Sequence, residues 1–245
     1  SYSKEFKASC VLAVLRGECN DCRINQIQKR AVGTAEVRRA FASATDDFEE
    51  GDVGAGAGTL CYGLKGGIGS ASRVIRIGET EYTIGVLVQS NFGATEDFVL
   101  NGEAVGAKIL DWKQEKDDMA ASEEDKGSIM SILATDLPLT SRQLKRILRR
   151  TGVGIARTGG YTGHGSGEVM IGFTTANRIP SGTEEKLLQI QAIPEHVINR
   201  AFLAAAEAEQ EAILNSMTAA ERTRGLAGEL YYSLAEYLED QDSKQ

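Results

Sequence analysis

The chain has 245 residues, of which 42% are hydrophobic and 25% are charged, and these are the proportions of a globular protein. Its formal net charge of −8 at pH 7 argues against nucleic acid as a partner, because neutralising phosphates requires a basic surface. No apolar run approaches the roughly 18 residues that a membrane helix needs, so no membrane partner is expected. Four cysteines are too few to staple a secreted domain, which favours a cytoplasmic location.

Glycine is concentrated in two segments of the chain. Of the 27 glycines, eight lie within residues 51–69 and eight within residues 152–172. Neither segment has the G-x-G-x-x-G or G-x-x-x-x-G-K-[ST] spacing of nucleotide-binding loops. Tight turns around a buried site are therefore favoured over a phosphate site.

The first half of the chain predicts a strand, a helical segment and a hairpin. Residues 10–15 form a short apolar run typical of a buried strand. Residues 24–44 carry apolar side chains at helical spacing, with Thr34 as a helix cap, which predicts one or two short helices. Segments 71–77 and 81–89 are rich in β-branched residues and are separated by a Gly-Glu pair, which indicates a β-hairpin.

The character of the chain changes sharply in its middle. Residues 111–126 hold seven acidic and three basic side chains with few apolar anchors, which predicts a solvated, mobile loop. Residues 128–135 follow at once as a short apolar run and predict a buried strand.

The second half predicts one strand between helices. A helix is expected from Thr140 or Ser141 to Ile155, with an apolar face and glycines that weaken its end. Residues 169–175 predict a strand, and residues 194–240 predict one long helix or two consecutive ones. Strands flanked by helices in this order favour a layered α+β sandwich, and we expect residues 1–245 to form a single domain.

Several polar clusters have ordinary interpretations. Cys19 and Cys22 lack the further ligands of a zinc site, so ordinary thiols and no metal are expected. His164 lies in the second glycine-rich segment without a G-x-S-x-G elbow, so a Ser-His-Asp triad is not favoured. A basic helical face is expected either to be solvated or to pair with carboxylates elsewhere; it consists of Arg142, Lys145, Arg146, Arg149 and Arg150.

The junction between Gly127 and Ser128 suits self-cleavage. Cutting this bond would give Ser128 a free α-amino group, whose ordinary pKa is about 7.7–8.0. That amine can act as the general base for the hydroxyl of the same residue, so no histidine is needed. Glycine before the serine also permits strained backbone conformations that favour an N-to-O acyl shift.

Four ordered segments around this junction resemble one known family. They are residues 51–73, 82–93, 127–144 and 157–177, and a matching helix with Asn215 lies beyond them. Together they are similar to the DmpA/BapA family of self-processing serine aminopeptidases, which are N-terminal-nucleophile-like hydrolases. The resemblance implies a four-layer αββα sandwich, also found in ornithine acetyltransferase, and cleavage into residues 1–127 and 128–245. It further implies a homo-oligomer of processed heterodimers that acts on small peptides or amides without a cofactor.

The resemblance also implies roles for individual residues. Ser128 matches the nucleophile, Asn91 the side chain that stabilises the oxyanion, and Glu18 the acid that receives the free amino group of the substrate. Ser166 and Glu168 match the residues that hydrogen-bond the nucleophile and its amine.

Two departures and two alternatives accompany this interpretation. Asn20 stands where some members of the family have a tyrosine, which puts a phenol contribution to the oxyanion site in doubt. The family also has further residues before this point, so preceding residues are expected to be missing here.

An acyltransferase of the ornithine acetyltransferase type is one alternative, although those enzymes present threonine as the nucleophile. A non-catalytic scaffold with the same fold is the other.

Overall fold

The structure is a computed structural model that describes residues 24, 29, 32–45, 47–116, 127–165, 167–179, 187–226 and 228–244. The strand predicted at residues 10–15 lies outside the described residues, as does most of the helical segment predicted before residue 32. Helix α2 (Thr34–Ala42) is the described part of that segment. It starts at Thr34 with Gly33 as its N-cap, so Thr34 is the first helical residue and not the cap.

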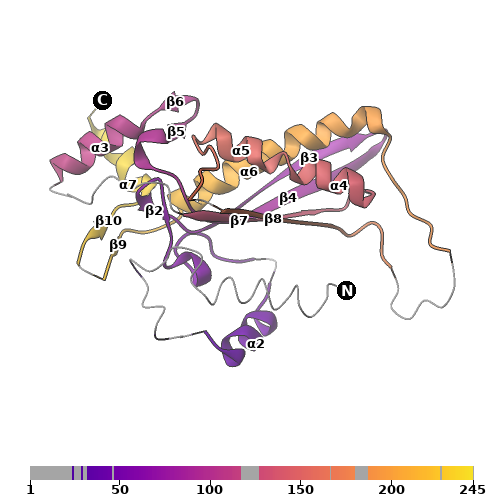
Figure 1. Ribbon diagram of the computed structural model, residues 1–245, viewed down its shortest axis with the longest axis horizontal. Coiled ribbons are helices and arrows are strands. Elements are labelled where there is room, and N and C mark those ends of the chain that lie inside the picture. The colour runs from indigo at the N-terminus through magenta and orange to yellow at the C-terminus, as the bar shows by residue number, and fades with distance from the viewer. Residues whose placement is uncertain are drawn as a thin grey trace.

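A four-stranded mixed sheet forms the centre of the described chain (Figure 1). Its strands, in spatial order, are β3 (Ile68–Ile77), β4 (Thr80–Asn91), β7 (Ser128–Thr135) and β8 (Gly167–Thr174). Strand β7 runs antiparallel to β4 and parallel to β8. The predicted hairpin is confirmed as β3 and β4, both longer than expected, with Gly78 at a φ of +64° in the turn.

Helices cover one face of this sheet. They are α4 (Ser141–Leu148), α5 (Thr151–Arg157) and α6 (Ile198–Thr218), which lie together on one side of the strands in Figure 1. Helix α6 packs across β3 and β4, because its buried face is made largely of alanines that let the helix approach the sheet closely. A Cβ on Gly69 would lie 2.1 Å from the Ala212 carbonyl oxygen, so β3 also needs a glycine at this crossing.

The opposite face of the sheet is apolar and open to solvent in the described part of the chain. Side chains alternate along each strand, so Leu87, Ile132 and Val169 share this face while Val86 and Leu133 point to the helices. Exposed fractions of 39–63% are found here for Val74, Ile132, Val169 and Phe173. Asn91 and Ser128 lie on the same face, at one end of the strands.

The remaining elements are short or peripheral. They are the 3-10 turns η2 (Gly54–Gly56), η3 (Thr95–Asp97) and η4 (Glu195–Val197), the strands β1 (Leu60–Cys61), β2 (Leu64–Lys65), β5 (Val99–Leu100), β6 (Glu103–Ala104), β9 (Thr223–Arg224) and β10 (Leu230–Tyr231), and the helices α3 (Gly106–Glu115) and α7 (Leu234–Ser243). Within the segment 194–240, for which one long helix or two consecutive helices were expected, the structure has two helices, α6 and the start of α7. The short strands β9 and β10 lie between them. None of the described helices is both long enough and apolar enough to cross a bilayer.

The predicted loop at residues 111–126 is wrong at its start. Residues 111–115 belong to α3, and Trp112 is buried with its ring 5.0 Å from that of Tyr232 and 5.5 Å from that of Tyr237. Its ring adds apolar area to that of the buried Ile109, and together they anchor a helix whose residues 111–115 are otherwise polar or charged. Residues 117–126 lie outside the described residues.

The predicted helix from Thr140 is present but divided. Helix α4 ends at Leu148 and α5 begins at Thr151, so the chain bends at Arg149 and Arg150. Thr140 caps α4: its side chain accepts the Gln143 backbone N–H at 3.2 Å, and Gln143 returns a bond to the Thr140 N–H.

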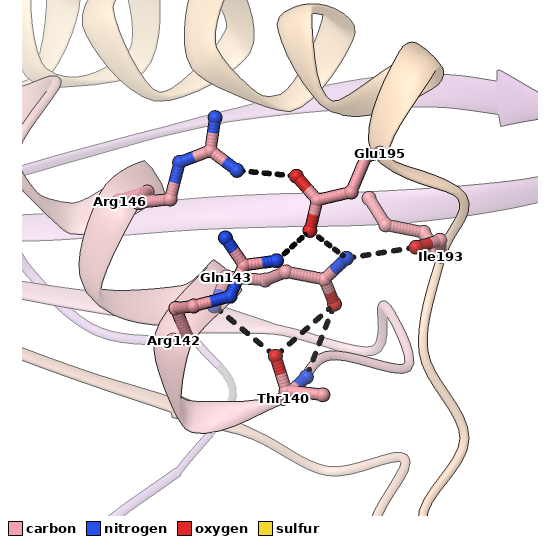
Figure 2. A network of polar contacts seen from close by, with 6 residues as sticks. All are labelled: Thr140, Arg142, Gln143, Arg146, Ile193 and Glu195. Atoms are coloured by element: carbon pink, nitrogen blue, oxygen red, sulfur yellow. Dashed lines mark hydrogen bonds and ion pairs between the residues drawn. The ribbon is translucent and has the colours of Figure 1, made fainter.

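Part of the basic helical face pairs with a carboxylate, which was one of the two expectations for this face. Figure 2 shows Arg142, Arg146 and Gln143 of α4 converging on Glu195, while Gln143 also donates to the Ile193 carbonyl at 2.7 Å. The hydrogen bond from Arg146, with the charge of Arg142, lowers the pKa of the Glu195 carboxyl. Arg150 instead stacks over the Phe202 ring at 4.2 Å.

Candidate active site

Ser128 and Asn91 meet at the end of the central sheet. Ser128 is the first residue of β7 and Asn91 the last of β4, and the two face each other on the final rung of the antiparallel ladder. Their side chains share the face that the helices do not cover. The Cβ atoms of directly opposed residues in such a ladder lie about 4.5–5.5 Å apart. Ser128 is half-buried, whereas Asn91 is only 3% exposed.

The Asn91 carboxamide has one satisfied and one unsatisfied end. Its Oδ1 accepts the Leu60 backbone N–H at 3.0 Å, which fixes the orientation of the amide. Its Nδ2 is buried and has no hydrogen-bond partner in the described part of the protein. A buried donor left without an acceptor costs free energy, and such a group at the Ser128 end of the sheet is suited to an oxygen that develops negative charge.

Gly127 is fixed by its contact with β4. A Cβ at this position would lie 1.9 Å from the Asn91 carbonyl oxygen, a distance at which no side chain fits. The residue before Ser128 must therefore be glycine as long as β4 and β7 keep this register. The peptide bond between Gly127 and Ser128 is consequently held next to Asn91.

Strand β8 brings Gly167 and Glu168 beside the nucleophile candidate. Gly167 pairs with Ser128, and a Cβ on Gly167 would lie 3.4 Å from the Ser128 Oγ. Glu168 pairs with Ile129, so alternation places its side chain on the face of the sheet opposite to the Ser128 side chain. Ser166, Glu18 and Asn20 lie outside the described residues.

The end of β4 is fastened to helix α6 by a chain of hydroxyl groups. The Gly67 N–H donates to Ser90 Oγ at 3.2 Å, and Ser90 Oγ lies 2.6 Å from Ser216 Oγ. The Ser216 hydroxyl also donates to the Ile213 carbonyl at 2.6 Å, and the Ser90 hydroxyl to the Gly67 carbonyl at 3.4 Å. Asn215 adds a bond from its side chain to the Ser70 carbonyl at 2.8 Å.

Lys65 is a buried ionisable group that the sequence did not reveal. Its side chain is fully buried, and its Nζ donates to the carbonyls of Gly56, Thr59 and Gly66 at 2.8, 3.1 and 2.7 Å. Burial lowers the pKa of this ammonium to about 8, against the opposing charges of Asp52 and Cys61. The sequence feature that could have revealed this burial is a lysine placed between glycines in an otherwise apolar segment.

Glu209 is a second buried ionisable group that the sequence did not reveal. It lies on α6 with no exposed surface and accepts the Ser131 hydroxyl at 2.5 Å, while its Oε2 has no partner in the described part of the chain. Burial raises the pKa of its carboxyl to about 7, and the bond from Ser131 opposes that shift. Ser131 stands three residues after Ser128 on β7, so this pair ties β7 to α6.

No group of three or more His, Cys, Asp or Glu side chains within the described ranges is placed to hold a metal ion. At the Ser128 end of the sheet, the described residues supply a hydroxyl group, a buried amide donor and neighbouring backbone groups.

Comparisons with known proteins show which family the chain resembles. The sequence profile of Peptidase family S58 matches residues 3–231. The beta-peptidyl aminopeptidase BapA of Sphingosinicella xenopeptidilytica is 36% identical over 225 residues, covering 89% of this chain and 56% of that protein. The chain thus spans little more than half the length of this relative.

Solved structures show the same similarity. A protein of Pyrococcus horikoshii OT3 superposes with a TM-score of 0.80 at 44% identity, over 90% of this chain and 60% of that one. The L-aminopeptidase D-Ala-esterase/amidase of Ochrobactrum anthropi, described as a variant of the Ntn hydrolase fold, gives 0.79 at 35% identity over the same shares. The predicted α+β sandwich of the Ntn-hydrolase type is thereby confirmed, and the described sheet and helices form one β-layer and one α-layer of it. The profile match over most of the sequence shows that the chain belongs to peptidase family S58.

Proposed function

We propose that this chain is part of a self-processing serine aminopeptidase or amidase that removes the N-terminal residue from small peptides, amides or esters. The observation that carries the proposal is the final rung of the ladder between β4 and β7. There Ser128 begins a central strand, Gly127 is packed on the Asn91 carbonyl, and the Asn91 Nδ2 is buried without a partner.

Processing begins with the Ser128 hydroxyl attacking the carbonyl carbon of Gly127. The bond from that carbon to the Ser128 nitrogen breaks, the nitrogen keeps its electron pair and takes a proton, and an ester to Oγ forms. Water then cleaves the ester, which leaves a carboxylate on Gly127 and a free α-amino group on Ser128. The new amine stays at the start of β7, where it can act as a base.

Turnover uses the same hydroxyl on an external substrate. The Ser128 α-amine accepts the Oγ proton as Oγ attacks the substrate carbonyl, and the Asn91 Nδ2–H₂ donates to the oxyanion that forms. The leaving amine takes the proton from the α-ammonium, and an acyl ester remains on Ser128. Water hydrolyses this ester and restores the enzyme.

Family resemblance assigns the supporting roles. Glu168 lies on the strand beside Ser128 with its side chain on the opposite face, so we assign it to the α-amino group, which leaves the strand near the plane of the sheet. Ser166 is assigned to proton transfer at the nucleophile. Glu18 and its neighbour Asn20 are assigned to the free amino group of the substrate, which would explain aminopeptidase specificity.

The relatives delimit the substrate class without resolving it. One is named a beta-peptidyl aminopeptidase and another an L-aminopeptidase D-Ala-esterase/amidase. Both names describe substrates with an amino-terminal aminoacyl group, and the backbone of that group differs between them. We propose substrates of this shared class for the present chain, acted on by a homo-oligomer of processed heterodimers.

Mass spectrometry of the purified protein tests the processing step. We expect the wild type to give two fragments that meet between Gly127 and Ser128, and Ser128→Ala to stay intact. Ser70→Ala is a matched control, because Ser70 also follows a glycine within a strand of the same sheet and is expected to allow normal cleavage. An intact wild-type chain after prolonged incubation would remove the mechanism.

A panel of aminoacyl p-nitroanilides tests the activity. The panel includes L-α, D-α and β-amino acyl groups, each with a free and an N-acetylated amine. We expect hydrolysis of at least one class only when the amine is free, and none by Ser128→Ala. Transfer to an added amine in preference to hydrolysis would instead support the acyltransferase alternative.

A further inference from the structure

Lys65 carries a charge that the proposed mechanism does not yet use. Its ammonium is fully buried, and all three of its hydrogen-bond acceptors named above are backbone carbonyls, not carboxylates. Burying a cation without a contacting counter-ion disfavours the folded state. A neutral side chain would hold a structural turn at lower cost, so the charge points to a function that acts through the groups that Lys65 contacts.

One of its acceptors leads directly to Asn91. The Thr59 carbonyl, which accepts from Lys65 Nζ at 3.1 Å, belongs to the same peptide unit as the Leu60 N–H. That N–H donates at 3.0 Å to the Oδ1 of Asn91, and the other end of the Asn91 carboxamide is the unpartnered Nδ2. Two conjugated amides therefore stand in series between the ammonium and the free donor.

Resonance within each amide transmits the effect of the positive charge from the Lys65 ammonium toward the Asn91 Nδ2. A cation on the Thr59 oxygen withdraws electron density from its amide and makes the Leu60 N–H a stronger donor. A stronger bond to Oδ1 in turn makes the Asn91 Nδ2–H₂ more acidic, because consecutive hydrogen bonds polarise one another by about 10–30% each. The same chain fixes the plane of the carboxamide, which sets the direction of its free N–H bonds.

We propose that Lys65 is a positioning residue for oxyanion stabilisation, acting through the Thr59–Leu60 peptide to orient and polarise the Asn91 side-chain amide. This inference rests on the proposed function, in which Asn91 donates to the oxyanion. Lys65 touches neither substrate nor nucleophile in this role. Its effect belongs to the transition state, where the oxygen of the substrate carries most charge.

The bonds from Lys65 to Gly56 and Gly66 also stabilise the first glycine-rich loop, so the test must separate structure from catalysis. A double-mutant cycle with Asn91 does so, using kcat for hydrolysis of the best p-nitroanilide by the full-length protein. We expect Lys65→Gln to lower kcat roughly tenfold with little change in KM, since removing a whole oxyanion donor costs roughly 10²–10³. In the Asn91→Ala background the same substitution should change kcat by less than about twofold.

Lys113 provides the matched control. It is also a buried lysine whose Nζ donates to a carbonyl, that of Gly63, but the Gly63 peptide is not bonded to Asn91. We expect Lys113→Gln to leave kcat within about twofold of the wild type. Lys65→Met, which lacks any donor, serves as the second variant if Lys65→Gln does not fold, and thermal unfolding confirms that each variant is folded.

A pH profile gives an independent readout. In the wild type, kcat should fall as Lys65 loses its proton near its lowered pKa of about 8. The charged or titratable groups that act on Lys65 are Asp52 and Cys61, and the Ser128 amine titrates in the same region of pH. We expect the alkaline fall to be absent in Lys65→Gln and retained in Cys61→Ala, which removes the thiol as its origin.

The outcomes are distinguishable. Equal losses of kcat from Lys65→Gln in the wild-type and Asn91→Ala backgrounds would overturn the inference, as would an unchanged kcat or an equal loss in Lys113→Gln. In each of these cases a dead Ser128→Ala variant leaves the proposed function intact. Full activity in Ser128→Ala would overturn the proposed function and this inference together.

Discussion

At the residue scale, the Asn91 carboxamide combines a fixed carbonyl with a free donor. The Leu60 N–H holds Oδ1 in place, and Ser90 next to it is bonded to both Gly67 and Ser216. In the proposed role of Asn91, such preorganisation means that the site rearranges little when the oxyanion forms, and this is the main source of electrostatic stabilisation in active sites.

Asn91→Ala therefore tests the donor directly. We expect kcat to fall by roughly 10²–10³ while KM changes little, because the lost bond is made only in the transition state. Steady-state kinetics on a free-amine p-nitroanilide measures both parameters. Gln89→Ala is the control, since Gln89 shares the strand and the face with Asn91 but its side chain donates to the Ala55 carbonyl. A loss confined to KM would contradict the role of Asn91.

The site residues differed in how far the sequence revealed them. Ser128 and Asn91 were expected from a motif whose glycine and turn residues are recognisable, and the structure places them on one rung. Lys65 and Glu209 were missed because lysine and glutamate are usually solvated, and only the packing around each shows that it is buried. The side of the sheet on which Glu168 lies depends on register, which a single sequence does not specify.

At the element scale, helix α4 depends on its N-terminal cap. The Thr140 hydroxyl accepts the Gln143 backbone N–H, and the Thr140 backbone N–H donates to the Gln143 side-chain carbonyl. The side-chain N–H groups of Gln143 also donate to the Ile193 carbonyl and to Glu195 (Figure 2). The cap thereby links the start of α4 to the segment that leads into α6.

Thr140→Ala should destabilise the protein by about 1 kcal/mol, the usual cost of losing a threonine N-cap. For a chain of this size, that change lowers Tm by about 2–4 °C, which differential scanning calorimetry resolves. Thr80→Ala, at an exposed position at the start of β4, should leave Tm nearly unchanged. Equal shifts in Tm for the two variants would argue against the capping role.

Elements with a clear pattern were predicted well, and those set by one long-range contact were not. Strand β7 matches the predicted 128–135 because turn and charged residues bracket an apolar run. Residues 111–115 were mistaken for a loop, since the packing of Trp112 on Tyr232 and Tyr237, together with the buried Ile109 of the same helix, docks a segment that is otherwise polar. The bend between α4 and α5 likewise depends on how both helices meet the sheet and α6.

At the scale of the whole molecule, Glu209 makes stability depend on pH. Its pKa in the folded state is about 7, above the ordinary value of 4.5, so the folded protein binds the proton more tightly than the unfolded chain. The stabilisation that comes from this tighter binding of the proton by Glu209 is fully present below about pH 4.5 and is lost as pH rises through 7. The shift corresponds to a loss of about 3 kcal/mol.

Glu209→Gln should remove this dependence, because the amide resembles the protonated acid. We expect urea unfolding at pH 8 to show the variant more stable than the wild type by up to about 3 kcal/mol, with the difference shrinking toward zero near pH 4.5. Glu207→Gln, on the same helix but partly exposed beside Arg73, should show no such trend. A constant difference across this range of pH would mean that Glu209 is not the titrating group.

The position of Ser128 within the sheet also determines what happens to the two halves after the proposed cut. Strands β3 and β4 precede the cut and β7 and β8 follow it, so a single sheet is divided between the products. Eight residue pairs join β4 to β7, and α6 from the second product lies across both strands of the first. After the proposed cut, the two fragments would have to unfold this core to separate or exchange partners, so we expect each processed molecule to keep the half with which it was synthesised.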